Sequence, residues 1–215
     1  MKSSRIIELF FYNKVMKTIK LNKMEKDKAI DILLNGGILA FPTDTVFGLA
    51  AMPKREDMDK VYEAKGRSFD KPLPMMCNSI EMIERYAYVS EEAKKIMKAF
   101  VPGPLTLIFK KRVEIGDYIT NGMKTIGIRV PDDDWILSLL EELDEPLMVT
   151  SANLSNHPSL LKWAEVYEQL DGRIDGIVME DARGDKASTI VDVTSEMKIL
   201  REGPISIEQI LEVLK

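Results

Sequence analysis

The stretch from Gly36 to Ala51 constrains the fold more than any other part of the chain. The apolar run Ile38 to Phe41 predicts a buried strand, and Pro42 ends it because proline cannot donate a hydrogen bond to a neighbouring strand. Residues 43–45, Thr-Asp-Thr, come next, and a second apolar run rich in glycine and alanine follows them. Polar groups at the end of a buried strand favour a ligand site, although a plain strand-to-loop junction with an Asx turn at Asp44 explains the same residues.

Composition sets limits on the class of protein. At 215 residues the chain is long enough for one domain with a sizeable core, and its formal net charge of −5 argues against a protein that coats nucleic acid non-specifically. Cys77 and His157 are its single cysteine and histidine, which excludes an internal disulfide and a cysteine-based metal cluster and disfavours a zinc enzyme. Since no apolar run approaches membrane-spanning length, we expect a cytoplasmic protein with no membrane contact.

The order of the predicted elements favours an α/β fold. Short apolar runs alternate with segments of helical periodicity, and no linker, repeat or low-complexity stretch separates them. This pattern predicts a single α/β domain over residues 16–215, with helices flanking a twisted mixed sheet. Residues 1–15 are predicted to be an N-terminal extension, because Met16 is a more natural start for the domain.

Some boundaries are marked clearly. A helix is predicted from about Glu56 to Ala64, and a basic loop follows it over residues 65–73. The segment from Lys111 to Lys124 is predicted to be a loop. Ser206 and Gln209 have the spacing of a capping box, which places the start of the last helix.

Polar side chains gather where the predicted strands begin or end. They carry hydroxyl, amide and guanidinium groups and belong to Thr43, Thr45, Thr106, Arg129, Thr150, Ser151, Asn153, Ser188 and Arg201. If the sheet brings them together, they form a basic ligand cavity overhung by Lys65, Arg67 and Lys71. Such a cavity suits a polyanion, because lysines supply charge and arginines bind pairs of oxygens. The alternative is that residues 65–67 are a solvated helix end and residues 151–153 a turn without a ligand.

The same residues limit the chemistry. The sequence has no phosphate loop of the Gly-x-x-x-x-Gly-Lys-Ser/Thr type and no Gly-x-Gly-x-x-Gly fingerprint. Ser151 and Ser155 have no evident base, since His157 belongs to the same loop, so a serine-hydrolase interpretation is weak. Positioning and charge stabilisation remain, as in phosphoryl or nucleotidyl transfer.

Seven motifs, in the same order along the chain, resemble those of the YrdC/Sua5 family of threonylcarbamoyl-AMP synthases. They are Phe41-Pro-Thr-Asp-Thr-Val-Phe-Gly-Leu49, Lys65-Gly-Arg67 with Lys71-Pro-Leu73, Pro102-Gly-Pro-Leu-Thr106, Ile128-Arg-Val-Pro131, Thr150-Ser-Ala-Asn-Leu-Ser155, Ser188-Thr-Ile-Val-Asp192 and Arg201-Glu-Gly203. As a set they are highly specific, and they resemble the short form with one YrdC-like domain. Ser68, where the family often has proline, and Asn156-His157, in place of a glycine-containing continuation, depart from the pattern without removing a polar ligand.

The resemblance implies a reaction. ATP, bicarbonate and L-threonine give threonylcarbamoyl-AMP and pyrophosphate, and the product serves the N6-threonylcarbamoyl modification of adenosine in tRNA. The implied cofactor is Mg²⁺ bound with ATP, with no organic cofactor and no protein metal site. The implied partner is a downstream tRNA threonylcarbamoyl-transferase complex, with at most weak binding of RNA by the chain itself.

The resemblance also implies roles for individual residues. The implied ATP-binding residues are Lys65, Arg67, Thr106, Ser151, Asn153 and Arg201, of which Lys65 and Arg67 are the catalytic ones. The implied threonine-binding residues are Thr43, Thr45, Lys71, Arg129, Thr150 and Ser188. Two alternatives stay open: an RNA-binding module of the same family, and an enzyme that forms a carbamoyl-adenylate, like the homologous domain of hydrogenase-maturation proteins.

Overall fold

The computed structural model describes residues 17–215. The predicted extension, residues 1–15, lies outside this range. The described strands are β1 (Ile19–Leu21), β2 (Leu39–Phe41), β3 (Gly48–Ala51), β4 (Met75–Met76), β5 (Ala87–Tyr88), β6 (Leu105–Lys111), β7 (Thr125–Arg129), β8 (Leu147–Ser151), β9 (Gly176–Val178), β10 (Thr189–Asp192) and β11 (Lys198–Arg201). The helices are α2 (Lys26–Leu34), α3 (Arg55–Lys65), α4 (Ile80–Tyr86), α5 (Glu91–Phe100), α6 (Asp134–Leu143), α7 (Trp163–Leu170) and α8 (Ile207–Glu212), with 3₁₀ turns η1 (Lys23–Glu25) and η2 (Asp117–Thr120).

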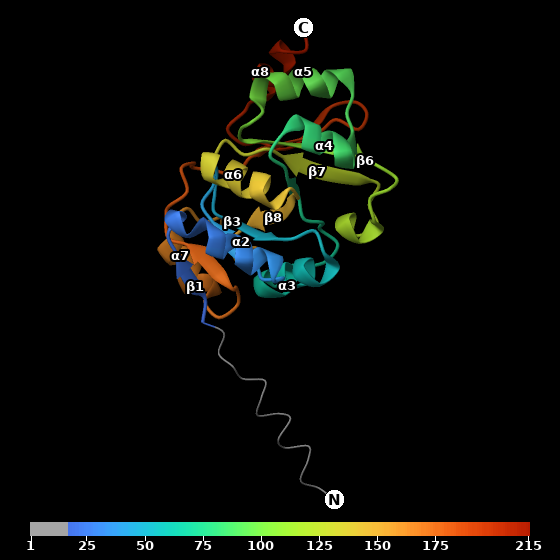
Figure 1. Cartoon of the computed structure of the whole chain (residues 1–215). Helices are drawn as coiled ribbons and strands as arrows, with labels where there is room; N and C mark the ends of the chain where they lie inside the picture. Colours follow the sequence, from blue (N-terminus) through green and yellow to red (C-terminus); the bar gives the residue numbers. More distant parts are fainter. Residues whose placement is uncertain (1–16) are drawn as a thin grey trace, which may run out of the picture.

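All strands belong to one mixed sheet, which confirms the predicted α/β architecture (Figure 1). The strand order is β1-β9-β2-β3-β8-β4-β7-β6-β10-β11, and β5 pairs with β6. The pairs β2–β3, β3–β8, β8–β4 and β6–β7 are antiparallel, whereas β4–β7 and β6–β10 are parallel. Strands β1, β3 and β5 and the turn η2 were not predicted, because each is too short to show a periodic pattern.

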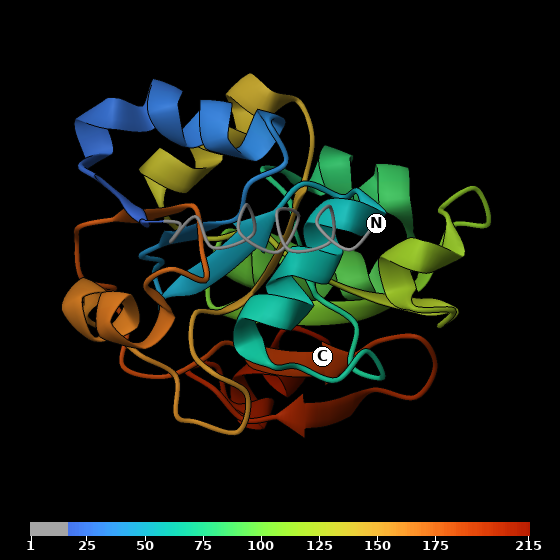
Figure 2. The ribbon, with the colours of Figure 1, turned by 90° about the horizontal axis from the view of Figure 1, so that it is seen from below.

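The two faces of the sheet have separate cores. On β2, Leu39 and Phe41 pack with residues of α2 and α6, whereas Ala40 packs on the other face with residues of α3 and α7. Successive side chains of a strand point to opposite faces, so the continuous apolar run of β2 serves both cores. Helices α2 and α6 lie side by side and are joined by the ion pair of Lys26 with Glu142 (Figures 1 and 2).

Helices α2 and α6 cover only part of their face. On β6, Leu105, Leu107 and Phe109 belong to the core on the opposite face, whereas Thr106 and Ile108 line a cavity. On the half of the face that no helix covers, alternate side chains of a strand can be polar, because they are accessible to a ligand rather than packed in a core.

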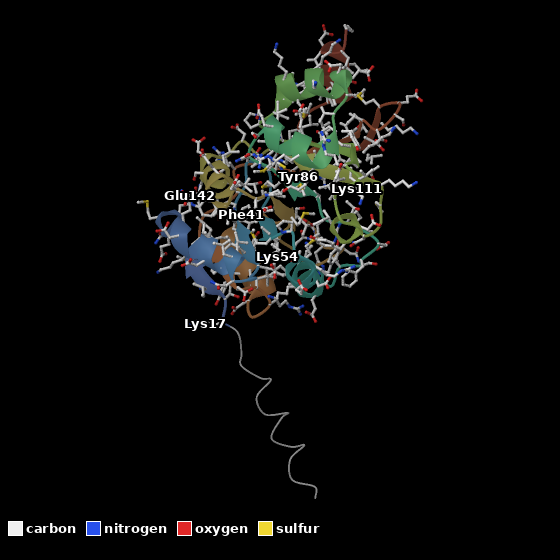
Figure 3. The ribbon with its side chains drawn as sticks, turned by 45° about the vertical axis from the view of Figure 1, so that its right-hand side comes forward. Lys17, Phe41, Lys54, Tyr86, Lys111 and Glu142 are labelled. Carbon is white, nitrogen blue, oxygen red and sulfur yellow. The ribbon has the colours of Figure 1, made fainter. Side chains whose placement is uncertain are left out.

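The ends of the domain are well defined. Ser206 and Gln209 form the predicted capping box of α8, which lies with α5 at one end of the domain (Figure 1). Lys17, where the described chain begins, lies at the other end, and Phe41 is fully buried between the helices (Figure 3). Within residues 17–215, no helix has the length and apolarity needed to span a membrane.

Candidate functional site

A cavity of about 320 Å³ opens on the uncovered half of the sheet. Residues of β6, β7 and β8 form its floor, and the turn between β2 and β3 forms one wall. The predicted site residues that line it are Thr43, Thr45, Arg67, Thr106, Arg129, Thr150, Ser151, Ser188 and Arg201. The sheet thus brings together residues that lie far apart in the sequence, as their positions at strand ends predicted.

A second cavity of about 290 Å³ adjoins the first and shares Arg67 and Ser151 with it. The remaining predicted residues, Lys65, Lys71 and Asn153, line this second cavity. Lys71 was grouped with the threonine-binding residues, but it lines only the second cavity, because it lies in the exposed loop after α3.

Arg129 forms the centre of the first cavity. Its side chain is 8% exposed and donates through Nη2 to Asp44 Oδ1 at 2.6 Å, through Nη1 to Thr45 Oγ1 at 2.7 Å and through Nε to the carbonyl of Gly103 at 3.0 Å. Burial lowers the pKa of Arg129, and the carboxylate of Asp44 opposes that shift. A guanidinium has five N–H groups, so two remain for a ligand.

The turn that contains Thr43 and Thr45 is fixed by its own hydroxyl groups. The two Oγ1 atoms lie 2.9 Å apart, and Thr43 Oγ1 donates to the carbonyl of Val46 at 2.7 Å. Gly184 packs against this turn so closely that an added Cβ would lie 2.3 Å from the carbonyl oxygen of Thr45. Both hydroxyls therefore face the cavity from a rigid turn.

A second guanidinium approaches the cavity from β11. Arg201 donates to Ser188 through Nε, at 2.9 Å from the carbonyl, and through Nη2, at 3.1 Å from Oγ. Ser188 Oγ in turn lies 2.8 Å from Thr106 Oγ1. Burial and the positive charge of Arg129 both lower the pKa of Arg201, so two cations repel each other across one cavity. An anionic ligand would relieve that repulsion.

Lys65 ties α3 to the loop after β8. It is the last residue of α3, is 2% exposed, and donates through Nζ to the carbonyls of Ser151 and Asn153, the latter at 2.5 Å. Its own carbonyl accepts from the amide of Ser155 at 2.8 Å. Burial, and to a smaller extent the charge of Arg67, lower the pKa of Lys65 to about 7. The prediction that Lys65 lies in the loop is therefore wrong, because it is the last residue of the helix. Its burial also contradicts the alternative, a solvated helix end, for this residue.

Arg67 begins the basic loop. Gly66 ends α3 with a φ of 58°, a conformation that glycine adopts without strain, and turns the chain toward the cavities. Arg67 donates through Nε to the carbonyl of Lys71 at 3.1 Å and through Nη2 to that of Pro72 at 3.3 Å. Burial lowers its pKa. It lines both cavities, so one guanidinium can contact groups in each.

The hydrogen-bonding groups of Asn153 are partly occupied within the protein. Its Nδ2 already donates to the carbonyls of Leu154 at 2.7 Å and His157 at 2.9 Å. Its Oδ1 is buried and has no hydrogen-bond partner among residues 17–215. Of the donor and acceptor groups of this amide, only the acceptor therefore remains for a ligand.

The described residues place no activated nucleophile in either cavity. His157 is exposed, and its Nδ1 lies 3.2 Å from the carbonyl of Ser155. Cys77 is buried in the core, and burial raises the pKa of its thiol. The arrangement is therefore suited to binding anions and stabilising charge rather than to covalent catalysis.

The sequence analysis missed several lining residues. Thr125 and Gly127 stand on β7 at the alternate positions that lead to Arg129, and Thr120 lies in η2. Counting back from Arg129 in steps of two would have found the first two. Asp44 was noted only as part of a turn, and its ion pair with Arg129 depends on a contact between distant segments.

Comparisons with known proteins decide the family. Residues 31–203 match the family described as "Telomere recombination", which is that of Sua5, YciO and YrdC. The chain belongs to this family. A Methanocaldococcus jannaschii member is 37% identical over 206 residues, which are 92% of this chain and 97% of that protein. The Bacillus subtilis threonylcarbamoyl-AMP synthase is 38% identical over 201 residues, 91% of this chain but 58% of that enzyme.

The fold agrees with a solved structure of the same family. Pyrococcus abyssi Sua5, in a crystal structure complexed with L-threonine, superposes with a TM-score of 0.83 and is 33% identical. The match covers 92% of this chain and 60% of that one. The chain thus spans about three fifths of the B. subtilis and P. abyssi relatives and nearly all of the M. jannaschii one.

Proposed function

We propose that this chain makes threonylcarbamoyl-AMP and pyrophosphate from ATP, bicarbonate and L-threonine. The observation that carries the proposal is the pair of adjoining cavities, each basic, with Arg67 and Ser151 common to both. A reaction that joins a carboxylate-bearing substrate to a nucleotide and releases pyrophosphate needs two anion sites that meet at the reacting phosphate. The name of the B. subtilis relative and the L-threonine bound in the P. abyssi structure support this choice of product and substrate.

The larger cavity takes threonine. The free N–H groups of Arg129 are the natural partners of its carboxylate, because a guanidinium binds two carboxylate oxygens at once. Thr43, Thr45 and Ser188 supply short hydroxyl groups that can meet the substrate's own polar groups. Leu73 to Met76 add an apolar stretch to the lining.

The phosphates of ATP lie where the cavities meet. The amine of threonine reacts with bicarbonate to give a carbamate and water, and a carbamate oxygen then attacks the α-phosphorus while pyrophosphate leaves. Arg67 and Ser151 face that position from both cavities, and Arg201 approaches it from β11. These groups hold the α-phosphate and stabilise the negative charge that develops on its oxygens, so no side chain need form a covalent bond.

Mg²⁺ fits this arrangement as a companion of ATP. Among residues 17–215 no cluster of three or more histidine, cysteine, aspartate or glutamate side chains exists. Asn153 lines the second cavity, and its Oδ1 has no hydrogen-bond partner among the described residues. A neutral oxygen of this kind can coordinate Mg²⁺ or accept a hydrogen bond from a water bound to it. Bound with the nucleotide, Mg²⁺ would neutralise charge on the phosphates.

The product is then passed on. An acyl-adenylate transfers its acyl group readily, so we expect it to serve a downstream enzyme complex that modifies adenosine in tRNA, in the cytoplasm. The test is to supply ATP, bicarbonate and each amino acid in turn and to look for the adenylate by mass spectrometry. The proposal is supported if threonylcarbamoyl-AMP forms when threonine is supplied with ATP and bicarbonate, and if no adenylate forms with the other amino acids. In a parallel assay carbamoyl phosphate replaces bicarbonate and the amino acid, because a carbamoyl group needs a source of nitrogen. A carbamoyl-adenylate formed there, with no threonylcarbamoyl-AMP in the first assay, would contradict the proposal and favour the carbamoyl alternative.

A further inference from the structure

The loop over residues 66–72 holds Arg67, whose amide donates to the carbonyl of Tyr62 at 2.9 Å and so fixes the start of the loop at the end of α3. The side-chain contacts of Arg67 do not place the rest of the loop in the molecule. Its guanidinium donates to the carbonyls of Lys71 and Pro72, which belong to the same segment. Such bonds fix the internal shape of the loop and leave its position relative to the cavities to be set by something else.

That position is set by Tyr62, Phe69 and Asn121, which we name the Asn121 latch. Asn121 Nδ2 donates to Tyr62 Oη at 2.8 Å and to the carbonyl of Phe69 at 2.7 Å. Tyr62 Oη in turn donates to the carbonyl of Lys71 at 3.2 Å, and the rings of Tyr62 and Phe69 lie 4.6 Å apart between centroids. Because a carbonyl can only accept, the atom of Asn121 that faces Phe69 must be its amide nitrogen.

The latch connects the loop to the rigid part of the domain. Tyr62 is 1% exposed and belongs to α3, whereas Phe69 is 53% exposed. Asn121 follows η2, the yellow-green turn that lies beside α3 in Figures 1 and 2. Tyr118 of η2 donates to the carbonyl of Pro53, just before α3, at 3.1 Å. The turn is thus attached to α3 at Tyr62 and to the segment before α3 at Pro53. The loop is attached to both the turn and α3.

The backbone supports this use of Asn121. Its φ is 50°, in the left-handed region that asparagine tolerates better than most residues. The preceding residue, Thr120, lines the larger cavity. One short turn therefore touches the cavity wall and the loop that closes over it.

We propose that the Asn121 latch holds the loop of Arg67 in the position that ATP requires, which makes Asn121 and Tyr62 positioning residues for nucleotide binding. This inference rests on the proposed function, since it assigns Arg67 to the phosphates. Without the latch, the loop samples open positions. The apparent affinity for ATP is then the affinity of the closed form multiplied by the fraction of time that the loop is in place.

The test compares Asn121→Gly with Asp144→Gly in the full chain. Both wild-type residues have a positive φ at the end of a helical turn, 50° and 48°, so glycine suits both backbones equally. Asp144 ends α6 and lines neither cavity, so it controls for the backbone change. The first readout is tryptic cleavage of the Arg67–Ser68 bond in the protein without ligand, and the second is the KM for ATP and for threonine.

We expect Asn121→Gly to raise both the cleavage rate and the KM for ATP by roughly 5- to 30-fold, the effect of losing one or two net hydrogen bonds. The KM for threonine, kcat at saturating ATP and the thermal midpoint should stay close to those of Asp144→Gly. Cleavage and KM for ATP that match the control would overturn the latch. Faster cleavage with an unchanged KM for ATP would overturn the positioning role.

Tyr62→Phe gives a second route, because it keeps the ring against Phe69 and removes only the hydroxyl. It should raise cleavage and the KM for ATP in the same direction, and it decides the matter if Asn121→Gly does not fold. Proteolysis needs no turnover, so the cleavage result stands even if the wild-type protein forms no threonine-dependent product. That outcome would end the proposed function and not the structural role of the latch.

Discussion

Two arginines line the same cavity and are held in opposite ways. Arg129 is buried in β7, and its three partners come from the turn after β2 and from the segment before β6. Arg67 stands on a loop, and its own partners are carbonyls of that loop. The group that we assign to the carboxylate of threonine is therefore held by the sheet itself. Arg67, which we assign to the phosphates, is held by a loop that a few hydrogen bonds attach to the rest of the domain.

Mutations around the two arginines should therefore have different effects, on stability around Arg129 and on activity around Arg67. A change around Arg129 leaves a charge without its partner in a buried place, which lowers the stability of the whole domain. A change around Arg67 alters a part-exposed loop and should affect binding and catalysis first. Four experiments, ordered from the largest expected effect to the smallest, test the contrast.

Asp44→Ala should cause the largest loss of stability. Both side chains of the Asp44–Arg129 pair are less than a tenth exposed, so removal of the carboxylate leaves a buried guanidinium uncompensated. We expect the free energy of unfolding to fall by about 3–5 kcal/mol, measured by denaturant titration. Glu212→Ala, which breaks the exposed pair with Lys215, is the control and should change it by less than about 0.5 kcal/mol. A loss in Asp44→Ala as small as in the control would show that the buried pair does not stabilise the sheet.

Arg67→Ala should instead reduce activity. Loss of a group that stabilises transition-state charge typically lowers kcat by roughly 100- to 1,000-fold. The side chain bonds only within its loop, so the unfolding midpoint should stay close to that of the wild type. Steady-state kinetics and thermal unfolding of the same preparation decide the matter. Near-normal turnover in the folded variant would remove Arg67 from the catalytic set.

Lys65 should make stability depend on pH. Burial lowers its pKa from 10.5 to about 7, so between these values the unfolded chain carries a proton that the folded chain lacks. The free energy of unfolding then rises with pH across that window, by at most about 1.4 kcal/mol per pH unit. Below pH 7 Lys65 is protonated in both states, so it no longer makes the free energy of unfolding depend on pH. Lys65→Met removes the titrating group. The difference between wild type and Lys65→Met should therefore grow in favour of the wild type from pH 7 to pH 10 in parallel denaturant titrations, and a constant difference would contradict the account.

His157→Ala should have the smallest effect. The imidazole is exposed, and its one hydrogen bond to the described residues is with the carbonyl of Ser155. We expect kcat and KM within about two-fold of the wild type, since exposed substitutions of this kind change free energies by about 0.5 kcal/mol or less. A collapse of activity would show that a base operates next to Ser151, and the positioning mechanism would then be wrong.

Local patterns were enough to predict much of this structure. The strand ending at Pro42 and the cap at Ser206 depend on neighbours in the sequence, and both were confirmed. The helix predicted from Glu56 to Ala64 is present too, but it is one residue longer at each end. The strand-end rule also placed Thr106 and Arg201 in one cavity. These features follow from periodicity and turn chemistry, which a single sequence contains.

The partners of individual side chains were not predictable in this way. The burial of Lys65 depends on carbonyls 86 and 88 residues further along the chain. The contact of Asn121 with Tyr62 spans 59 residues, and that of Arg129 with Asp44 spans 85. Polar residues show no periodicity that reveals such pairs, because their partners are chosen by the tertiary fold.

The central claim is that the two sides of the site act on one reaction. The most direct measurement is the rate of pyrophosphate release from ATP by the full chain with threonine and bicarbonate supplied together and with each omitted. The account predicts release that requires both, since the carbamate formed from them is the nucleophile. Release at the same rate without threonine would contradict it.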